Sequence, residues 1–124
     1  MKQYKVDIQF ITNVFTKEEE LCSLFNGIEY YIDDKLINNK IYWTLDFELN
    51  QDDDFKIQTE YILAHIDKKQ LQVFNKKGNK IIIDIQVYYD TFTCSINLPS
   101  SFLYQIVSFF QDIEVNYSIY PTKF

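Results

Sequence analysis

The chain has 124 residues, of which 47% are hydrophobic and 18% are aromatic, a composition that excludes a disordered protein. Its formal net charge is −6 and all twelve basic residues are lysine, so nucleic-acid binding is not expected. This length predicts a single domain, residues 1–124. The N-terminus lacks the apolar core of a signal peptide, and no apolar run approaches about 18 residues, so we expect a cytoplasmic protein.

The first half of the chain shows stretches in which apolar and polar residues alternate, a pattern typical of strands with one buried face. Thr16 and Glu19 match a capping box, so a short helix is expected from there to about Phe25. Asn38–Asn39 is a turn signal. The alternation predicts strands over residues 3–10, 28–32 and 41–49.

The second half begins with the longest helical segment. Asp52–Asp54 should open it, because carboxylates cap free amides and oppose the helix dipole. The pattern indicates a break near Asp67 and a second helix that ends at Lys76–Gly78. Alternation then predicts strands over residues 80–90 and 91–98, an apolar stripe predicts a helix over 100–110, and a last strand covers 113–120.

This order of elements predicts an α+β two-layer sandwich, with a mainly antiparallel sheet and helices on one face. From Ile41 onward the order is strand, helix, strand, strand, helix, strand, which is the ferredoxin-like βαββαβ order. The first strand, the short helix and the second strand precede it as a βαβ extension.

Four stretches of the chain carry a resemblance to known proteins. They are Tyr42–Trp43 opening a strand, the long helix from Asp54, the Leu98–Leu103 entry to the last helix, and the final strand from Ile113 to Tyr120. In these features the chain resembles the uncharacterised bacterial family catalogued as domain of unknown function 4279. The resemblance implies no catalytic residues. Because comparable small acidic families occur beside bacterial toxins, it also implies that an immunity role should be considered.

Some residues outside the predicted polar face could carry chemistry, but each has a simpler structural interpretation. His65 is the only histidine and has no partner in sequence for a metal site or a catalytic pair. Asp52–Asp54 lacks the spaced ligands and central glycine of an EF-hand. Trp43 shares its face with apolar neighbours, and Cys22 and Cys94 are predicted to point inward as free thiols. We therefore expect no catalytic residue, cofactor or metal.

The polar side chains of the predicted strands should share the sheet face that points away from the helices. An acidic face with tyrosines suits a basic protein partner, because tyrosine supplies contact area and carboxylates steer association. An ordinary solvated face is the alternative, since many sheets expose one polar face to water. The candidate partner-binding residues are Tyr42, Asp46, Glu48, Asp84, Tyr88, Glu114 and Tyr120.

These observations favour a noncatalytic, acidic protein-binding module, and its sharpest form is an immunity-type protein that masks a basic toxin surface. The alternative is a small enzyme or ligand-binding domain with a pocket between the first helix and the sheet. An enzyme needs a concave site with convergent polar groups, whereas a binding module needs only an accessible surface. A homodimer through the same face or an exposed strand edge is a third arrangement. No membrane association is expected.

Overall fold

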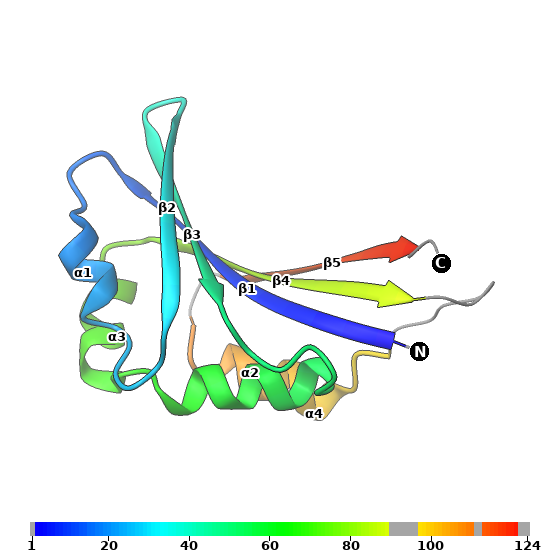
Figure 1. Cartoon of the computed structure of the whole chain (residues 1–124). Helices are drawn as coiled ribbons and strands as arrows, with labels where there is room; N and C mark the ends of the chain where they lie inside the picture. Colours follow the sequence, from blue (N-terminus) through cyan, green and yellow to red (C-terminus); the bar gives the residue numbers. More distant parts are fainter. Residues whose placement is uncertain (1, 90–96, 111–112, 122–124) are drawn as a thin grey trace.

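The computed structural model describes residues 2–89, 97–110 and 113–121, which form five strands and four helices (Figure 1). Within these residues, no helix is long and apolar enough to cross a membrane. In chain order the elements are β1 (Lys2–Asn13), α1 (Glu18–Cys22), β2 (Tyr30–Ile37), β3 (Lys40–Phe47), α2 (Phe55–Ala64), α3 (Lys68–Asn75), β4 (Lys80–Tyr89), α4 (Ser100–Val107) and β5 (Ile113–Pro121).

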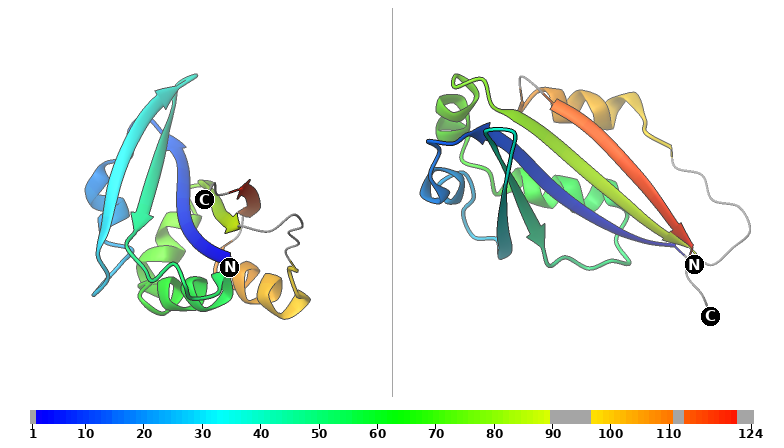
Figure 2. Two further views of the ribbon diagram at one scale, coloured as in Figure 1. Left: turned by 45° about the vertical axis from the view of Figure 1, so that its right-hand side comes forward. Right: turned by 90° about the horizontal axis from the view of Figure 1, so that it is seen from above.

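The strands form one mixed sheet in the order β2-β3-β1-β4-β5. The β2–β3, β3–β1 and β1–β4 pairings are antiparallel, and β5 joins β4 in parallel. The helices lie beside one face of this sheet, as the views in Figures 1 and 2 show. The predicted α+β two-layer sandwich, with a mainly antiparallel sheet and helices on one face, is therefore confirmed.

The ferredoxin-like order with a βαβ extension is not confirmed. β1 lies between β3 and β4, at the centre of the sheet, where the prediction treated it as an extension. A central place suits this strand, because Val6, Ile8 and Phe10 need cover from both neighbouring strands and from the helices. Residues 91–96 of the strand predicted after β4 lie outside the described residues, and residues 97–98 are not in a strand.

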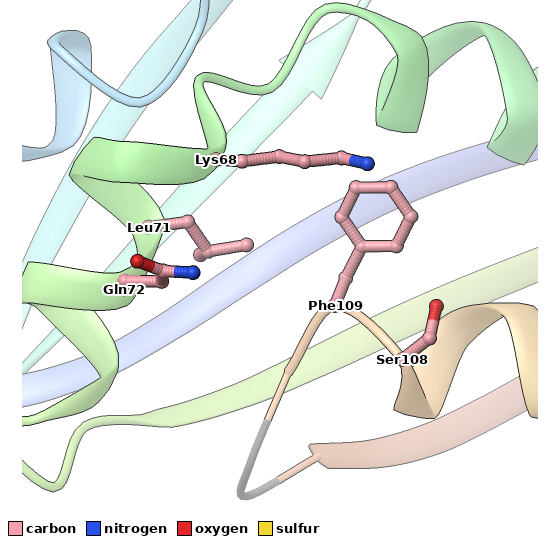
Figure 3. Close-up of a pocket in the computed structure, with 5 residues that line it drawn as sticks. All are labelled: Lys68, Leu71, Gln72, Ser108 and Phe109. Carbon is pink, nitrogen blue, oxygen red and sulfur yellow. The ribbon is translucent and has the colours of Figure 1, made fainter.

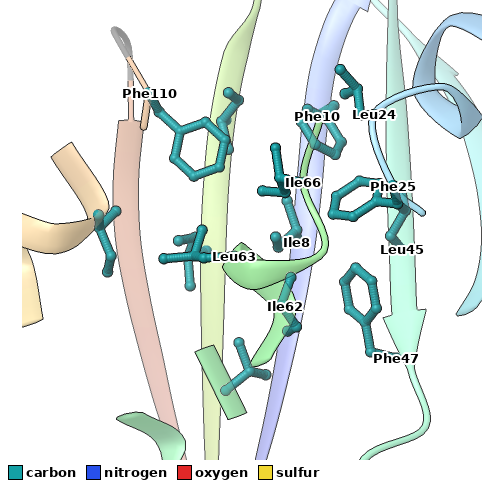
Figure 4. Packing of buried hydrophobic residues seen from close by; sticks show 14 of the residues in the cluster. Ile8, Phe10, Leu24, Phe25, Leu45, Phe47, Ile62, Leu63, Ile66 and Phe110 are labelled. Carbon is teal, nitrogen blue, oxygen red and sulfur yellow. The ribbon is translucent and has the colours of Figure 1, made fainter. Parts of the chain in front are cut away.

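The strand alternation builds the core. The register places Ile8 opposite Leu45 of β3 and opposite Ile83 of β4, and all three side chains are buried. Figure 4 shows Phe25 and Ile62 packed against this layer from the helical side. Each such fully buried side chain contributes roughly 1.5–3 kcal/mol of burial free energy.

Trp43 is part of this core, as predicted, with only 5% of its surface exposed. Its indole Nε1 donates a hydrogen bond to Thr12 Oγ1 at 2.9 Å. The Thr12 hydroxyl donates in turn to the Asn13 carbonyl at 3.0 Å. The polar group of the tryptophan is therefore satisfied inside the core, as a buried indole requires.

The start of α1 differs from the prediction. The Thr16 amide donates to the Asn13 carbonyl at 3.3 Å, and the Thr16 hydroxyl donates to Asn13 Oδ1 at 3.4 Å. The predicted capping box requires the Thr16 hydroxyl to bond to a helix amide, but in this turn the hydroxyl bonds to Asn13 instead. The helix begins at Glu18 instead, with Lys17 at the N-cap and no side-chain hydrogen bond there.

Cys22 is exposed, so the prediction of a buried thiol at this position was wrong. Leu21 and Leu24 are buried, and the helix ends at Cys22, before the predicted end near Phe25. One residue along a helix turns the side chain by about 100°, and this rotation carries Cys22 away from the side on which Leu21 packs. Cys94 lies outside the described residues.

The long helical segment consists of two helices with a break at Asp67, as predicted. Asp54 caps α2 by accepting a hydrogen bond from the Lys56 amide at 2.9 Å. Asp67 caps α3 by accepting from the amides of Lys69 at 3.0 Å and Gln70 at 3.1 Å. Both carboxylates satisfy amides that have no partner within the helix, which favours a capping role over metal binding.

The last helix, α4, exposes part of its predicted apolar stripe. Phe102 and Ile106, four residues apart, face the core, whereas Val107 is exposed. A helix of eight residues presents one narrow side to the sheet, and Val107 falls outside it. Pro99 occupies the N-cap, and the helix begins at Ser100, as predicted, but ends at Val107, before the predicted end at residue 110.

Candidate functional site

The face of the sheet opposite the helices, here called the open face, is covered by the outward side chains of all five strands. A hollow of about 490 Å³ lies over its centre. The residues of the open face include Lys5, Asp7 and Gln9 of β1, Tyr31, Asp33 and Lys35 of β2, Tyr42, Thr44 and Asp46 of β3, Ile82, Asp84, Gln86 and Tyr88 of β4, and Glu114, Asn116, Ser118 and Tyr120 of β5.

Three aspartates, here called the acid row, lie side by side across the central strands. Asp7 is directly opposite Asp46 of β3 and directly opposite Asp84 of β4. The Cβ atoms of such facing residues are about 4.5–5.5 Å apart, and like charges in this arrangement repel each other. Lys5 relieves part of the repulsion, because its ammonium hydrogen-bonds to Asp46 and lies 3.4 Å from Asp7 Oδ1.

Asp7 differs from the other members of the acid row because it is only 8% exposed. Burial raises the pKa of its carboxyl group above the ordinary value; the charge of Lys5 opposes this effect, and the charges of Asp46 and Asp84 add to it. For Lys5, burial lowers the pKa, but the hydrogen bond to Asp46 and the charge of Asp7 outweigh burial, so the pKa is raised. Lys5 therefore stays charged, and Asp7 binds a proton more readily than an exposed aspartate.

A hydrogen-bonded chain runs from the acid row to two tyrosines. Gln86 Nε2 donates to Asp7 Oδ2 at 3.0 Å and to Asp84 Oδ2 at 3.3 Å, and Gln86 Oε1 accepts from the Tyr88 hydroxyl at 2.8 Å. The Tyr88 ring stacks on Tyr120, with ring centroids 5.3 Å apart and planes at 22°. Burial and the neighbouring Tyr120 raise the pKa of the Tyr88 phenol. Rings held in this way lose little freedom when a partner binds.

Six of the seven predicted partner-binding residues lie on the open face. Glu48 does not, because it follows the last residue of β3 and lines a hollow at the edge of the molecule. Glu114 lies toward the rim, where it pairs with Lys80 at 3.6 Å. Tyr42 lies opposite Ile11, two rows away from the acid row. Asp46 and Asp84 thus belong to the acid row, Tyr88 is joined to it through Gln86, and Tyr120 stacks on Tyr88. Tyr42 and Glu114 lie elsewhere on the open face, and Glu48 lies off it.

The sequence prediction missed the contribution of β1 to the site. Lys5 and Asp7 alternate outward in the sequence, yet neither was a candidate, because alternation assigns a face to a side chain and gives no information on which strands are neighbours. One signal in the sequence could have marked β1 as part of the site. On this strongly apolar strand, an outward lysine stands two residues before an outward aspartate, which is an unusual placement.

The other sequence candidates have structural roles. His65 lies at the C-cap of α2, with Nδ1 2.7 Å from the Tyr61 carbonyl oxygen and its ring centroid 4.5 Å from that of Tyr61. In the described part of the chain, no group of three or more His, Cys, Asp or Glu residues could hold a metal ion.

A separate hollow of about 230 Å³ lies between α3 and the end of α4 (Figure 3). The Lys68 ammonium lies 5.3 Å from the centroid of the Phe109 ring, and Ser108 Oγ donates to the Gln105 carbonyl at 2.6 Å. The Ser108 hydroxyl is thus bonded to a main-chain carbonyl, and Lys68, the lining residue that could act as a base, lies over the Phe109 ring. The region between α1 and the sheet, where a ligand pocket was the alternative, contains the buried side chains of Leu21 and Leu24.

Searches against protein-family models, curated proteins and solved structures found no significant match to this chain. The open face is therefore the candidate site on the strength of its own geometry, which combines aligned carboxylates with a fixed pair of tyrosine rings.

Asp7→Asn should raise the free energy of unfolding at pH 7 by about 0.2–1 kcal/mol, the range for one unfavourable facing pair. Burial raises the pKa of Asp7 in the folded state, so the stability contributed by this group is present below the unfolded pKa and is lost as the pH rises through the folded pKa. The variant should therefore lose less stability than the wild type between pH 4 and pH 7. Urea melts across this range measure both effects.

The control for this variant is Asp34→Asn, at an exposed position of β2. It should leave the free energy of unfolding within about 0.5 kcal/mol of the wild type. A less stable Asp7→Asn protein at pH 7 would show that the ion pair with Lys5 outweighs burial and repulsion.

Proposed function

We propose that the chain is a noncatalytic protein-binding module whose open face docks onto a basic surface of a partner protein. The observation that carries the proposal is the acid row with the stacked Tyr88 and Tyr120 beside it. Carboxylates steer a basic partner toward the face, and tyrosine rings supply contact area and are common among residues that dominate binding energy.

Asp84 is the carboxylate best placed to meet a cation from a partner. Lys5 hydrogen-bonds to Asp46 and pairs with Asp7, and Lys80 pairs with Glu114. The hydrogen bond that Asp84 accepts comes from the neutral amide of Gln86 at 3.3 Å. A lysine or arginine of the partner would therefore give Asp84 a charged partner without breaking an internal ion pair.

The specific role that we propose is of the immunity type, in the bacterial cytoplasm, with a basic toxin surface as the partner. The resemblance to domain of unknown function 4279 and the net charge of −6 support this role. The open face suits the masking of a basic surface because it offers carboxylates without a group placed to do chemistry on the partner.

Affinity capture from a bacterial lysate tests the proposal. The face variant combines Asp84→Lys with Asp46→Asn, since asparagine still offers an acceptor to Lys5. The control combines Glu19→Lys with Asp34→Asn, which changes the net charge equally at exposed positions away from the open face. A basic protein should be retained by the wild type and the control and lost by the face variant. Retention of the same proteins by all three contradicts the proposal.

The chain should not bind nucleic acid. Phosphate contacts from cations supply most nonspecific affinity for nucleic acids, and a net charge of −6 with carboxylates at the centre of the open face repels phosphate. Fluorescence anisotropy with single- and double-stranded RNA and DNA at low salt should show no binding at micromolar protein. Salt-sensitive binding in that range would be the contrary result.

A further inference from the structure

Two shallow hollows adjoin at one edge of the molecule, where the start of β2, the loop after β3 and α2 meet. Their volumes are about 330 Å³ and about 240 Å³, and Glu48 lines both. No member of the acid row lines either hollow, although Tyr31 lies opposite Asp46, so this surface adjoins the margin of the open face. We call it the edge groove and define it by Glu29, Tyr31, Glu48, Asp53, Ile57 and Tyr61.

The edge groove combines negative charge with exposed apolar surface. Glu29, Glu48 and Asp53 contribute carboxylates, and the described residues that line the groove include no lysine or histidine. Tyr31 is 66% exposed and Tyr61 is 48% exposed. Large rings that remain this exposed beside carboxylates resemble the anchoring surfaces of protein interfaces and are unlike an ordinary solvated edge.

The floor of the groove is held in place before any partner binds. Gln58 is buried, and its Nε2 donates to the carbonyls of Asn50 at 3.2 Å and Asp53 at 2.9 Å, which fixes the loop that follows β3. The same amide donates to the Tyr4 carbonyl at 2.8 Å and so ties this loop to β1. A groove with a fixed floor requires little reorganisation on binding.

We propose that the edge groove binds an arginine-bearing extended segment of a partner protein. A guanidinium group pairs with carboxylates through two parallel hydrogen bonds and stacks on aromatic rings, and the groove offers both kinds of group. The two volumes lie at or below the lower end of the roughly 300–1,000 Å³ typical of small-molecule pockets, so each hollow suits one side chain. This inference adds a second surface to the molecule and does not depend on the open face.

A fluorescein-labelled heptapeptide of alternating arginine and valine, titrated with the chain at low salt, tests the inference by anisotropy. The groove variant combines Glu29→Gln, Glu48→Gln and Asp53→Asn. The control combines Asp46→Asn, Asp84→Asn and Glu114→Gln on the open face and removes the same number of charges. The groove variant should bind at least tenfold more weakly than the wild type, and the control should change affinity less than threefold.

Two further measurements separate specific binding from simple charge attraction. Tyr61→Ala leaves the net charge unchanged and should weaken binding at least threefold, and a peptide with lysine at the arginine positions should also bind at least threefold more weakly. Any one of three results would overturn the inference. They are no binding by the wild type, equal weakening in the groove variant and the control, and no effect of Tyr61→Ala on binding. None of these results bears on the open face, because capture of a basic protein tests that surface separately.

Discussion

Trp43→Ala should lower the free energy of unfolding by about 3–5 kcal/mol, the range for deleting a large buried aromatic side chain. Two costs add: the transfer free energy of the indole and the cavity left between β3 and the helices. Thr12 Oγ1 also loses the hydrogen bond that it accepts at 2.9 Å. Because Trp43 is the only tryptophan, urea melts should be followed by far-ultraviolet circular dichroism in both proteins.

The matched control is Tyr31→Ala on the neighbouring strand, where the ring is largely exposed. It should cost less than about 1 kcal/mol, as expected for a position outside the core. A loss below about 1 kcal/mol in Trp43→Ala itself would show that the indole is not packed and is free to contact a ligand.

Gln58→Leu should lower the free energy of unfolding by about 2–3 kcal/mol, because buried acceptors without donors each cost about 1–3 kcal/mol. The single amide group of Gln58 serves the carbonyls of Tyr4, Asn50 and Asp53, and leucine can serve none of them. Urea melts measure the loss. Gln70→Leu, on the exposed side of α3, is the control and should stay within about 0.5 kcal/mol of the wild type.

Gln58→Glu adds a dependence on pH to the same test. A carboxylate would face three carbonyl oxygens, whereas the protonated acid still has one hydrogen to donate. The folded-state pKa of the introduced group should be raised, so the variant should lose further stability as the pH rises from 4 to 7. Equal destabilisation at both ends of this range would show that water, rather than the side chain, satisfies the three carbonyls.

Local patterns predicted the elements that depend on neighbouring residues in the chain. Alternation located β3 and β4 and placed Trp43 inside, and the carboxylates at Asp54 and Asp67 marked the starts of two helices. These signals are local because a strand repeats every two residues and a cap acts within one turn. The capping box at Thr16 failed because a nearby side chain, Asn13, takes its hydroxyl, a competition that the motif does not encode.

The arrangement of strands could not be predicted in the same way. Alternation gives each strand two faces but leaves its neighbours open, so β1 was placed outside the motif and its Asp7 was overlooked. The acid row exists only because antiparallel register brings Asp46 and Asp84 to either side of that residue. The outward direction of these side chains was readable from the sequence, but the burial of Asp7 and its contact with Lys5 were not.

The central claim is that the open face is a docking surface for a basic protein, and surface plasmon resonance with the captured partner tests it most directly. Asp84→Lys with Asp46→Asn should slow association about tenfold or more at low salt and flatten its dependence on salt, because charge steers the encounter. Tyr88→Ala should mainly speed dissociation, because the stacked ring supplies contact area. An association rate and a salt dependence that both match the wild type in the charge variant would contradict the account.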